Sequence, residues 1–395
     1  MGYTNFTLFG TEARTSSDPS NVDSLESIHD ALHNTLGSNG HMTYLDYAAF
    51  DPVFWLHHTQ VDRLFAMFQV LQPNSYVLPY NVPGSTYTYP AGTSENVDSF
   101  LAPFHTNANG GQWTSTGAKT TTSMGYYYPE TKSGATAASV RTAVNSLYGG
   151  GSGTSTISSS RKRSSLVEFA SNLSKRVVKR DLVGDIASAL GIQEQATGGD
   201  LSYEYSASIV SQKFQVNGSY AIYMFLGTPP TDCKSWPFAD NLVGSHGVFA
   251  NYVPQGTVNP MASVDLLVTG SIPLTSSLIA VVNKGLLSGL KSELVQAYLT
   301  KNLQWRCSRY DGTEVPIADV PDLSITIVSS EVQPAKSKDQ FPTYGMWQNL
   351  PNITYGQAGG HRSRFWSTPK GDSYSRQMGY SKGSNIRIGL NIGRH

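Results

Sequence analysis

Hydrophobic residues recur at helical spacing in two stretches near the start of the chain, and each stretch predicts a helix. The first begins at residue 25 and ends at the glycines at 37 and 40, and its apolar stripe consists of Leu25, Ile28, Leu32 and Leu36. The second begins at Asp51-Pro52, a pair that suits a helix N-cap and first turn, and ends before Pro73. Its stripe consists of His58, Val61, Phe65 and Phe68, so His58 should point inward and His57 about a quarter turn away.

The hydrophobic pattern changes to a period of two after residue 200, which predicts strands. Tyr220 to Leu226 forms one strand run, and alternation returns at Leu323, Ile325 and Ile327. Asn217-Gly218 is typical of a hairpin turn, and one helix is expected from about residue 286 to 299. Residues 199–350 are therefore predicted to form a mostly β domain, a sandwich.

Composition divides the rest of the chain. Residues 74–124 are rich in glycine, proline, serine, threonine and tyrosine and are expected to be irregular. Residues 136–198 are assigned to a flexible linker because they contain GGGSGTSTISSS at 149–160, and residues 351–395 are expected to be disordered. The fold class is thus α+β, with a partial helical bundle at 1–135 before the sandwich.

Basic pairs and triplets follow the glycine- and serine-rich stretch, at 161–163, 175–176 and 179–180. They fit a solvated helix face, with apolar residues on the opposite side. They equally fit exposed processing sites between two domains. The sequence leaves both interpretations open.

Charge and cysteine content exclude some classes of protein. The chain has 28 basic and 28 acidic residues, so it lacks the positive charge of a nucleic-acid-binding protein. No apolar run is long enough to span a membrane and no signal peptide is visible, so we expect a soluble intracellular protein. Cys233 and Cys307 are expected to be buried thiols rather than a disulfide.

Five of the nine histidines lie between residues 25 and 68. His29 and His33 are one helical turn apart, so both imidazoles lie on one face, as in a helix that gives two nitrogen ligands to one metal. His58 from the second helix would complete a three-imidazole site. Imidazole suits copper, zinc, iron and nickel, so the ligand type alone does not choose the metal.

The string FDPVFWLHHTQVDR at 50–63 resembles the second copper-site signature of the tyrosinase, catechol oxidase and hemocyanin family. The Glu-x-x-His-x-x-x-His pattern formed by Glu26, His29 and His33 matches the same half-site in fungal tyrosinases, as does the Gly-His-Met triplet at 40–42. GYYYPE at 125–130 resembles the tyrosine motif that closes the catalytic domain of that family. Segments in the β-rich region resemble its C-terminal domain, at 220–227, 302–306 and 340–347.

The resemblance implies a role for each matched residue. His29, His33 and His58 would be the copper ligands. Glu26 stands where the family has a glutamate that orders a water near the metals, and this water is thought to help deprotonate a phenol. Asp30 replaces the asparagine of many members that hydroxylate monophenols, so the resemblance supports catechol oxidation more than monophenol hydroxylation.

The remaining implications concern neighbouring residues and partners. His41 and His57 are expected to be hydrogen-bonding core histidines, with Phe54 packed beneath the site.

The substrates would be a small phenol and dioxygen, and the products would be o-quinones that feed melanin-type pigments. The C-terminal domain would cover the copper entrance until a protease cuts the linker, and the sequence does not identify the side chain that blocks the site.

The family uses two copper ions, and its first site takes three further histidines from helices that precede the second. No other histidines of this chain form a spaced helical pair. We therefore expect only the second copper site here, in a truncated tyrosinase that is weakly active or inactive alone. The alternatives are a hemocyanin-like copper- or oxygen-binding protein, a decayed fragment, or a mononuclear zinc hydrolase with Glu26 as its base. Metal analysis and a search for upstream histidines distinguish them.

Overall fold

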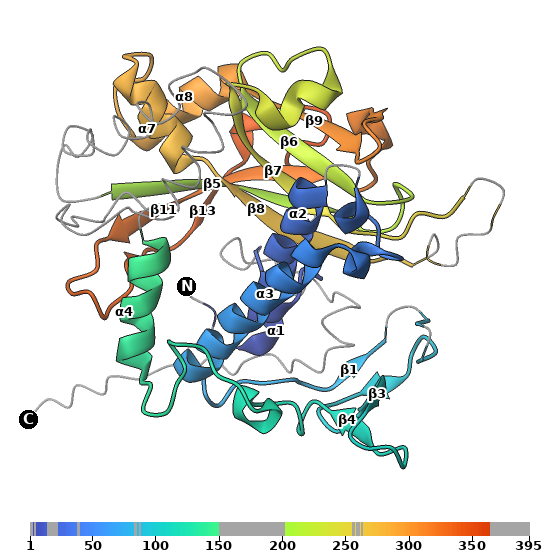
Figure 1. Cartoon of the computed structure of the whole chain (residues 1–395). Coiled ribbons are helices and arrows are strands. Elements are labelled where there is room, and N and C mark those ends of the chain that lie inside the picture. Colours follow the sequence, from blue (N-terminus) through green and yellow to red (C-terminus); the bar gives the residue numbers. More distant parts are fainter. Residues whose placement is uncertain are drawn as a thin grey trace, which may run out of the picture.

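The computed structural model describes residues 3, 5–13, 23–37, 40–82, 85–86, 88–149, 202–254, 257, 261 and 264–363 (Figure 1). Helices dominate the N-terminal part, and two β-sheets form the C-terminal domain. This is the predicted α+β fold.

The N-terminal part is built around two facing helices, α2 (Leu25–Gly37) and α3 (Pro52–Leu71), which match the two predicted helices. Its other helical elements are α1 Phe6–Gly10, α4 Ala137–Tyr148 and 3₁₀ turns at His41–Thr43, Ala48–Phe50 and Thr121–Met124. Asp51 caps α3, because its Oδ1 accepts the Val53 N–H at 3.0 Å, and Pro52 occupies the first turn.

The apolar stripe of α2 lies on the exposed side of the helix. Ile28, Leu32 and Leu36 are 47%, 38% and 52% exposed. The buried positions of α2 are polar: Ser27, Asp30, His33 and Asn34. Helix α2 therefore presents its polar side to the rest of the described chain, which the hydrophobic pattern does not predict.

Residues 74–124 are largely irregular, as predicted, but contain two small antiparallel pairs. Strand β1 (Tyr80–Asn81) pairs with β2 (Ser94–Glu95), and β3 (Phe100–His105) pairs with β4 (Gln112–Thr114).

The tyrosine motif at 125–130 is attached to α3. The hydroxyls of Tyr126 and Tyr128 donate to Asp62 Oδ2 at 2.7 and 2.5 Å, and Arg63 pairs with Glu130 at 2.5 Å. Asp62 and Arg63 therefore hold this segment against the helix.

The C-terminal domain is a sandwich of two antiparallel sheets. One has the order β10-β9-β6-β7, and the other has the order β12-β11-β5-β8 with β13 paired to β11. The strands are β5 Ser202–Gln212, β6 Tyr220–Leu226, β7 Leu242–Val248, β8 Leu267–Pro273, β9 Leu303–Arg309, β10 Glu314–Val315, β11 Ser324–Gln333, β12 Thr343–Tyr344 and β13 Gln348–Leu350. Helices α7 (Thr275–Asn283) and α8 (Ser292–Asn302) and 3₁₀ turns at Cys233–Phe238, Ile317–Asp319 and Pro351–Ile353 complete it.

Alternate side chains from both sheets fill one core. Ile209 of β5 and Ile325 of β11 point into it from one sheet, and Ile222 of β6 and Trp305 of β9 from the other. The alternation that predicted the strands therefore also identifies the side chains that face this core, although the opposite faces of β6 and β11 are largely buried as well.

Two local predictions in this domain are wrong. Asn217 and Gly218 do adopt positive φ angles of 57° and 112°, but β5 and β6, which flank them, belong to different sheets, so the turn is not a hairpin. The helix expected at 286–299 corresponds to α8, which begins only at Ser292, and α7 ends before the expected range begins. Gly285 and Gly289, both with positive φ, lie between them and interrupt the helical backbone.

The predicted linker begins too early. Helix α4 occupies 137–148 within it, with Thr136 in a capping box and Val140 fully buried. Arg141 and Asn145 donate to backbone carbonyls at 338–340, so the C-terminal domain anchors this helix. The basic clusters lie outside the described residues.

The C-terminal domain also extends past its predicted end at residue 350. The Trp305 indole donates to the Ala358 carbonyl at 3.0 Å, and Gly360 forms a β-bridge with Ile325. Residues 351–363 therefore belong to the domain, and the rest of the predicted disordered tail lies outside the described residues.

Both cysteines are free: Cys307 is buried in the core, and the Cys233 thiol contacts the Gly312 carbonyl at 2.8 Å. In the described part of the chain, no helix combines the length and apolar character required to cross a bilayer.

The N-terminal part packs directly on the sandwich (Figure 1). The Glu12 carbonyl accepts the Thr269 N–H at 2.8 Å, and Ala13 bridges Val268, so this segment lies along the edge of β8.

Helix α2 crosses β7 at Gly247. A Cβ at Gly247 would lie 3.0 Å from the Ala31 Cα and 2.6 Å from Asn34 Nδ2, so only glycine permits this approach.

We predict that Gly247→Val loosens the contact between α2 and β7. Overpacking of this kind costs about 1–3 kcal/mol. Amide exchange in α2 should rise, while β5 and β11 in the sandwich core keep their protection. Unchanged exchange in α2 would contradict the prediction.

Candidate metal centre

Three histidine nitrogens converge where α2 faces the start of α3. The Nε2 atom of His58 lies 3.4 Å from Nε2 of His29 and 3.2 Å from Nε2 of His33. Nitrogens bound to one ion at roughly 2.0–2.1 Å would be separated by similar distances. The three residues predicted as ligands are therefore brought together.

His57 joins the same group. Ligand atoms of His29, His33, His57 and His58 all lie within 4.8 Å of one another. The His57 side chain is buried, and its Nε2 has no hydrogen-bond partner among the described residues. The sequence interpretation set His57 aside as a core residue, whereas the structure makes it a possible fourth ligand.

The Nδ1 atoms of two histidines are held by acceptors. His33 Nδ1 lies 2.9 Å from the Met42 carbonyl, and His29 Nδ1 lies 2.9 Å from Asp30 Oδ1. A carbonyl or carboxylate oxygen can only accept, so each Nδ1 carries the proton and each Nε2 has a free lone pair. Both rings are in the tautomer that a metal requires at Nε2.

The environment favours the neutral form of three imidazoles, those of His33, His57 and His58. Burial and the neighbouring histidines lower the pKa of His57 and of His58 to about 4. Burial also lowers the pKa of His33, although its bond to the Met42 carbonyl opposes this. Neutral imidazole is the form that binds a metal, so these residues can act as ligands at neutral pH.

Two aromatic rings enclose the cluster. Phe54 stacks on His58 with ring centroids 4.1 Å apart, as expected for a residue beneath the site. Phe249, which follows β7 in the C-terminal domain, stacks on His33 at 4.4 Å. The C-terminal domain thus places an aromatic side chain against a candidate ligand.

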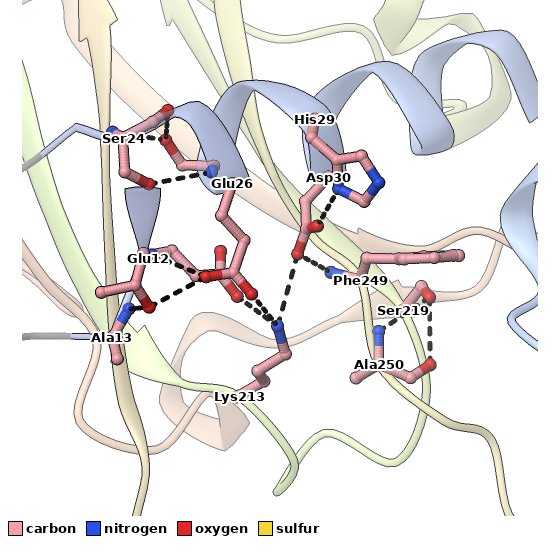
Figure 2. Close-up of polar contacts among 12 residues, drawn as sticks. Glu12, Ala13, Ser24, Glu26, His29, Asp30, Lys213, Ser219, Phe249 and Ala250 are labelled. Carbon is pink, nitrogen blue, oxygen red and sulfur yellow. Dashed lines mark hydrogen bonds and ion pairs between the residues drawn. The ribbon is translucent and has the colours of Figure 1, made fainter. Parts of the chain in front are cut away.

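Figure 2 shows the polar contacts of Asp30 with His29, Lys213 and Phe249. Its Oδ1 accepts from His29, and its Oδ2 accepts the Phe249 N–H at 3.1 Å and lies 3.5 Å from Lys213 Nζ. Burial raises the pKa of Asp30, but the His29 bond, Lys213 and the Phe249 N–H outweigh it, so the pKa lies below its usual value. Asp30 is therefore an ionised carboxylate.

Glu26 contacts the N-terminal segment. Its Oε2 accepts the Glu12 N–H at 2.9 Å and the Thr11 hydroxyl at 3.0 Å, and its Oε1 lies 3.7 Å from Lys213 Nζ (Figure 2). These contacts hold residues 11 and 12 beside α2. The water-ordering role assigned to Glu26 stays a prediction.

His41 does not belong to the cluster. It is exposed and contacts the Tyr47 ring, so it is not the core histidine that was expected.

Two family models match the chain. The common central domain of tyrosinase matches residues 2–71, and the tyrosinase C-terminal domain matches residues 204–327. Both copper-type motifs of α2 and α3 lie inside the first match, and most strands of the sandwich lie inside the second.

Curated relatives cover both regions. A tyrosinase of Neurospora crassa is 28% identical over 415 residues, which is 87% of this chain and 60% of the relative. A tyrosinase of Podospora anserina is 32% identical over 308 residues, which is 71% of this chain and 54% of the relative. The chain thus spans between half and two thirds of each of these relatives.

A solved structure shares the fold. The structure of latent and active mushroom tyrosinase matches with a TM-score of 0.63 and 21% identity, covering 89% of this chain and 58% of that one.

Sequence reasoning did not find Phe249 and Lys213. Phe249 follows a strand with no distinctive motif, and Lys213 is one of many isolated basic residues. Only the docking of the two domains brings them to Asp30. His57 did carry a signal, because adjacent histidines at a helix start already suggest a ligand site.

We predict that acid destabilises the metal-free chain in part through these histidines. The unfolded imidazoles take up protons near pH 6.5, whereas folded His57 and His58 do so only near 4. Between these values the unfolded state binds more protons, so the free energy of unfolding falls as the pH falls.

Chemical denaturation at pH 7 and at pH 4.5 checks this, with His58→Asn as the comparison. The variant should lose less stability on acidification than the wild type. An equal loss in both proteins would contradict the prediction.

Proposed function

Because the chain belongs to the tyrosinase family, we propose that it is a tyrosinase-type copper oxidoreductase acting on phenols or catechols with dioxygen to give o-quinones. The observation that carries the proposal is the convergence of the Nε2 atoms of His29, His33 and His58. Their separations of 3.2 and 3.4 Å suit a shared ion. Three imidazole ligands suit copper among other metals, and the family favours copper.

The residues around the cluster have defined tasks in this proposal. Bound copper would supply the redox chemistry that oxidises the phenolic ring. The Met42 carbonyl and Asp30 hold the Nδ1 protons of His33 and His29, so that both rings keep Nε2 toward the ion. Phe54 supports His58 from below, and Phe249 covers His33.

We propose that this chain supplies one copper site and is weakly active or inactive by itself. Within the described residues, one group of histidines is arranged to hold a metal. The family acts through two coppers, and oxidation of a catechol removes two electrons. The apolar side chains of α2 at Ile28 and Leu32 and of α3 at Trp55 and Leu56 are exposed, which suits packing of further protein there.

We predict that the purified chain binds about one copper ion, as measured by elemental analysis after dialysis. His29→Ala, His33→Ala and His58→Ala should each weaken binding by more than the roughly 10- to 100-fold cost of losing an outer partner. The exposed His41→Ala is the matched control and should bind like the wild type. His57→Ala should also retain copper if three ligands suffice.

Some results would overturn the assignment. Retention of copper by all three ligand variants would exclude this cluster as the site. Preference for zinc over copper would favour the hydrolase interpretation instead. Efficient catechol oxidation by the wild-type chain alone would contradict the proposal of a single, weakly active site.

We also propose that the C-terminal domain covers the site until the linker is cut. The Phe249 ring stacks on His33, and the Phe249 backbone N–H donates to Asp30, so both the side chain and the backbone of this residue contact α2 at the cluster. A phenol would have to displace this ring to lie over the same imidazole.

We predict that Phe249→Ala exposes the cluster. A chelator added to copper-loaded protein should then extract the metal several-fold faster, as followed by the chelator's absorbance. Tyr252→Ala is the matched control, because Tyr252 is an exposed aromatic three residues farther along. Equal extraction rates from both variants and the wild type would argue against a covering role.

A copper- or oxygen-binding protein without oxidase activity is the second candidate. The same Phe249 contact favours it, because a covered site can bind a metal without admitting a phenol. Catechol oxidation by Phe249→Ala together with a polypeptide that supplies the second copper would exclude it.

A further inference from the structure

One lysine of the C-terminal domain lies among three carboxylates of the N-terminal part. Lys213 follows β5, and its Nζ pairs with Glu12, lies 3.5 Å from Asp30 Oδ2 and lies 3.7 Å from Glu26 Oε1 (Figure 2). The side chains of Lys213, Glu12 and Asp30 are 14%, 1% and 3% exposed. Only the Glu26 side chain, 37% exposed, reaches solvent, so the rest of this ion cluster is almost completely removed from water.

A buried cluster of this kind depends on its single cation. Burial opposes the charge on Lys213, but the three carboxylates outweigh it and raise the pKa of the lysine. Burial and the charge of Asp30 raise the pKa of Glu12 although Lys213 pairs with it. Without the lysine, the carboxylates would repel one another at close range in a region of low dielectric.

Asp30 connects this cluster to the histidines. One of its oxygens accepts from His29 Nδ1, and the other contacts Lys213 and the Phe249 N–H. Two of its three partners therefore come from the C-terminal domain. The carboxylate that orients His29 is itself held by that domain.

We infer that Lys213 is a positioning residue of the metal site, which holds Asp30 so that His29 keeps its Nε2 directed at the other two ligands. The C-terminal domain would then contribute to metal affinity as well as covering the site. This inference rests on the proposed function, since it gives Lys213 a part in holding copper.

The loss of the lysine charge and the loss of its contact with Asp30 would change the metal affinity in opposite directions. Removal of a positive charge near a cation site would by itself tighten metal binding. Loss of positioning weakens it, because Asp30 moves away from Glu12 and Glu26 and His29 loses its fixed orientation. We expect positioning to dominate, because Lys213 directly contacts the carboxylate that orients His29, whereas its charge would act on the metal only from beyond that carboxylate.

The experiment measures the dissociation constant for copper(II) in the full chain, by competition with a chelator of known affinity. Lys213→Met should bind about tenfold more weakly, the lower end of the range for outer partners. Lys213→Arg keeps the charge and should restore most of the affinity. The visible absorption of the copper-loaded protein should shift in Lys213→Met, because the His29 ring is no longer fixed.

Ser271→Ala is the matched control. Ser271 also joins the two parts of the chain, through a 2.8 Å bond to Asp23, but does not contact Asp30. It should bind copper like the wild type. Amide exchange in β5 and β11 verifies that each variant is folded, and Lys213→Gln replaces Lys213→Met if the latter is not.

The outcomes separate the inference from the proposed function. A wild-type chain that binds no copper would overturn the proposed function. A wild-type chain that binds copper, with Lys213→Met equal to Ser271→Ala or tighter, would overturn the positioning role alone. Weaker binding in Lys213→Met, with rescue by arginine, supports it.

Discussion

The buried carboxylate of Asp30 is the constraint on which the arrangement of this protein depends. A charged group can remain inside a protein only where donors replace the water that it has lost. Asp30 obtains them from His29 beside it in α2, and from Lys213 and the Phe249 N–H of the C-terminal domain. The same three contacts orient a candidate ligand, attach the sandwich to α2 and position the aromatic ring that covers the cluster.

This constraint explains why α2 is turned the opposite way from its hydrophobic pattern. Helix α2 buries Asp30, His33 and Asn34 and exposes Ile28 and Leu36. These polar side chains are buried because they face the histidines of α3 on one side and β7 on the other. Gly247 of β7 permits the close contact that this burial needs. The candidate metal centre and the domain interface therefore share Asp30, and this shared carboxylate is the basis of the proposed influence of the C-terminal domain on access and affinity.

Local sequence predicted the elements that depend on short-range physics. The caps of α3, the one-turn spacing of His29 and His33, and the alternation of β11 are fixed by backbone geometry within a few residues. The structure contains the cap and the spacing, and β11 directs Ile325 and Ile327 into the core. The Asn217-Gly218 turn shows the limit of this reasoning. Its backbone angles follow from its residues, but the strands that it joins pair with distant partners in two sheets.

The sequence by itself determined which residues could hold a metal, because ligand chemistry and helical periodicity are local properties of His29, His33 and His58. The tertiary structure alone decided that His57 joins them, that Phe249 covers His33, and that Lys213 lies among three acidic residues. These relations link positions more than 180 residues apart in the case of Lys213 and Asp30. No local pattern records the positions of Phe249 and Lys213, because their contacts arise only when burial of the polar side of α2 brings the two domains into contact.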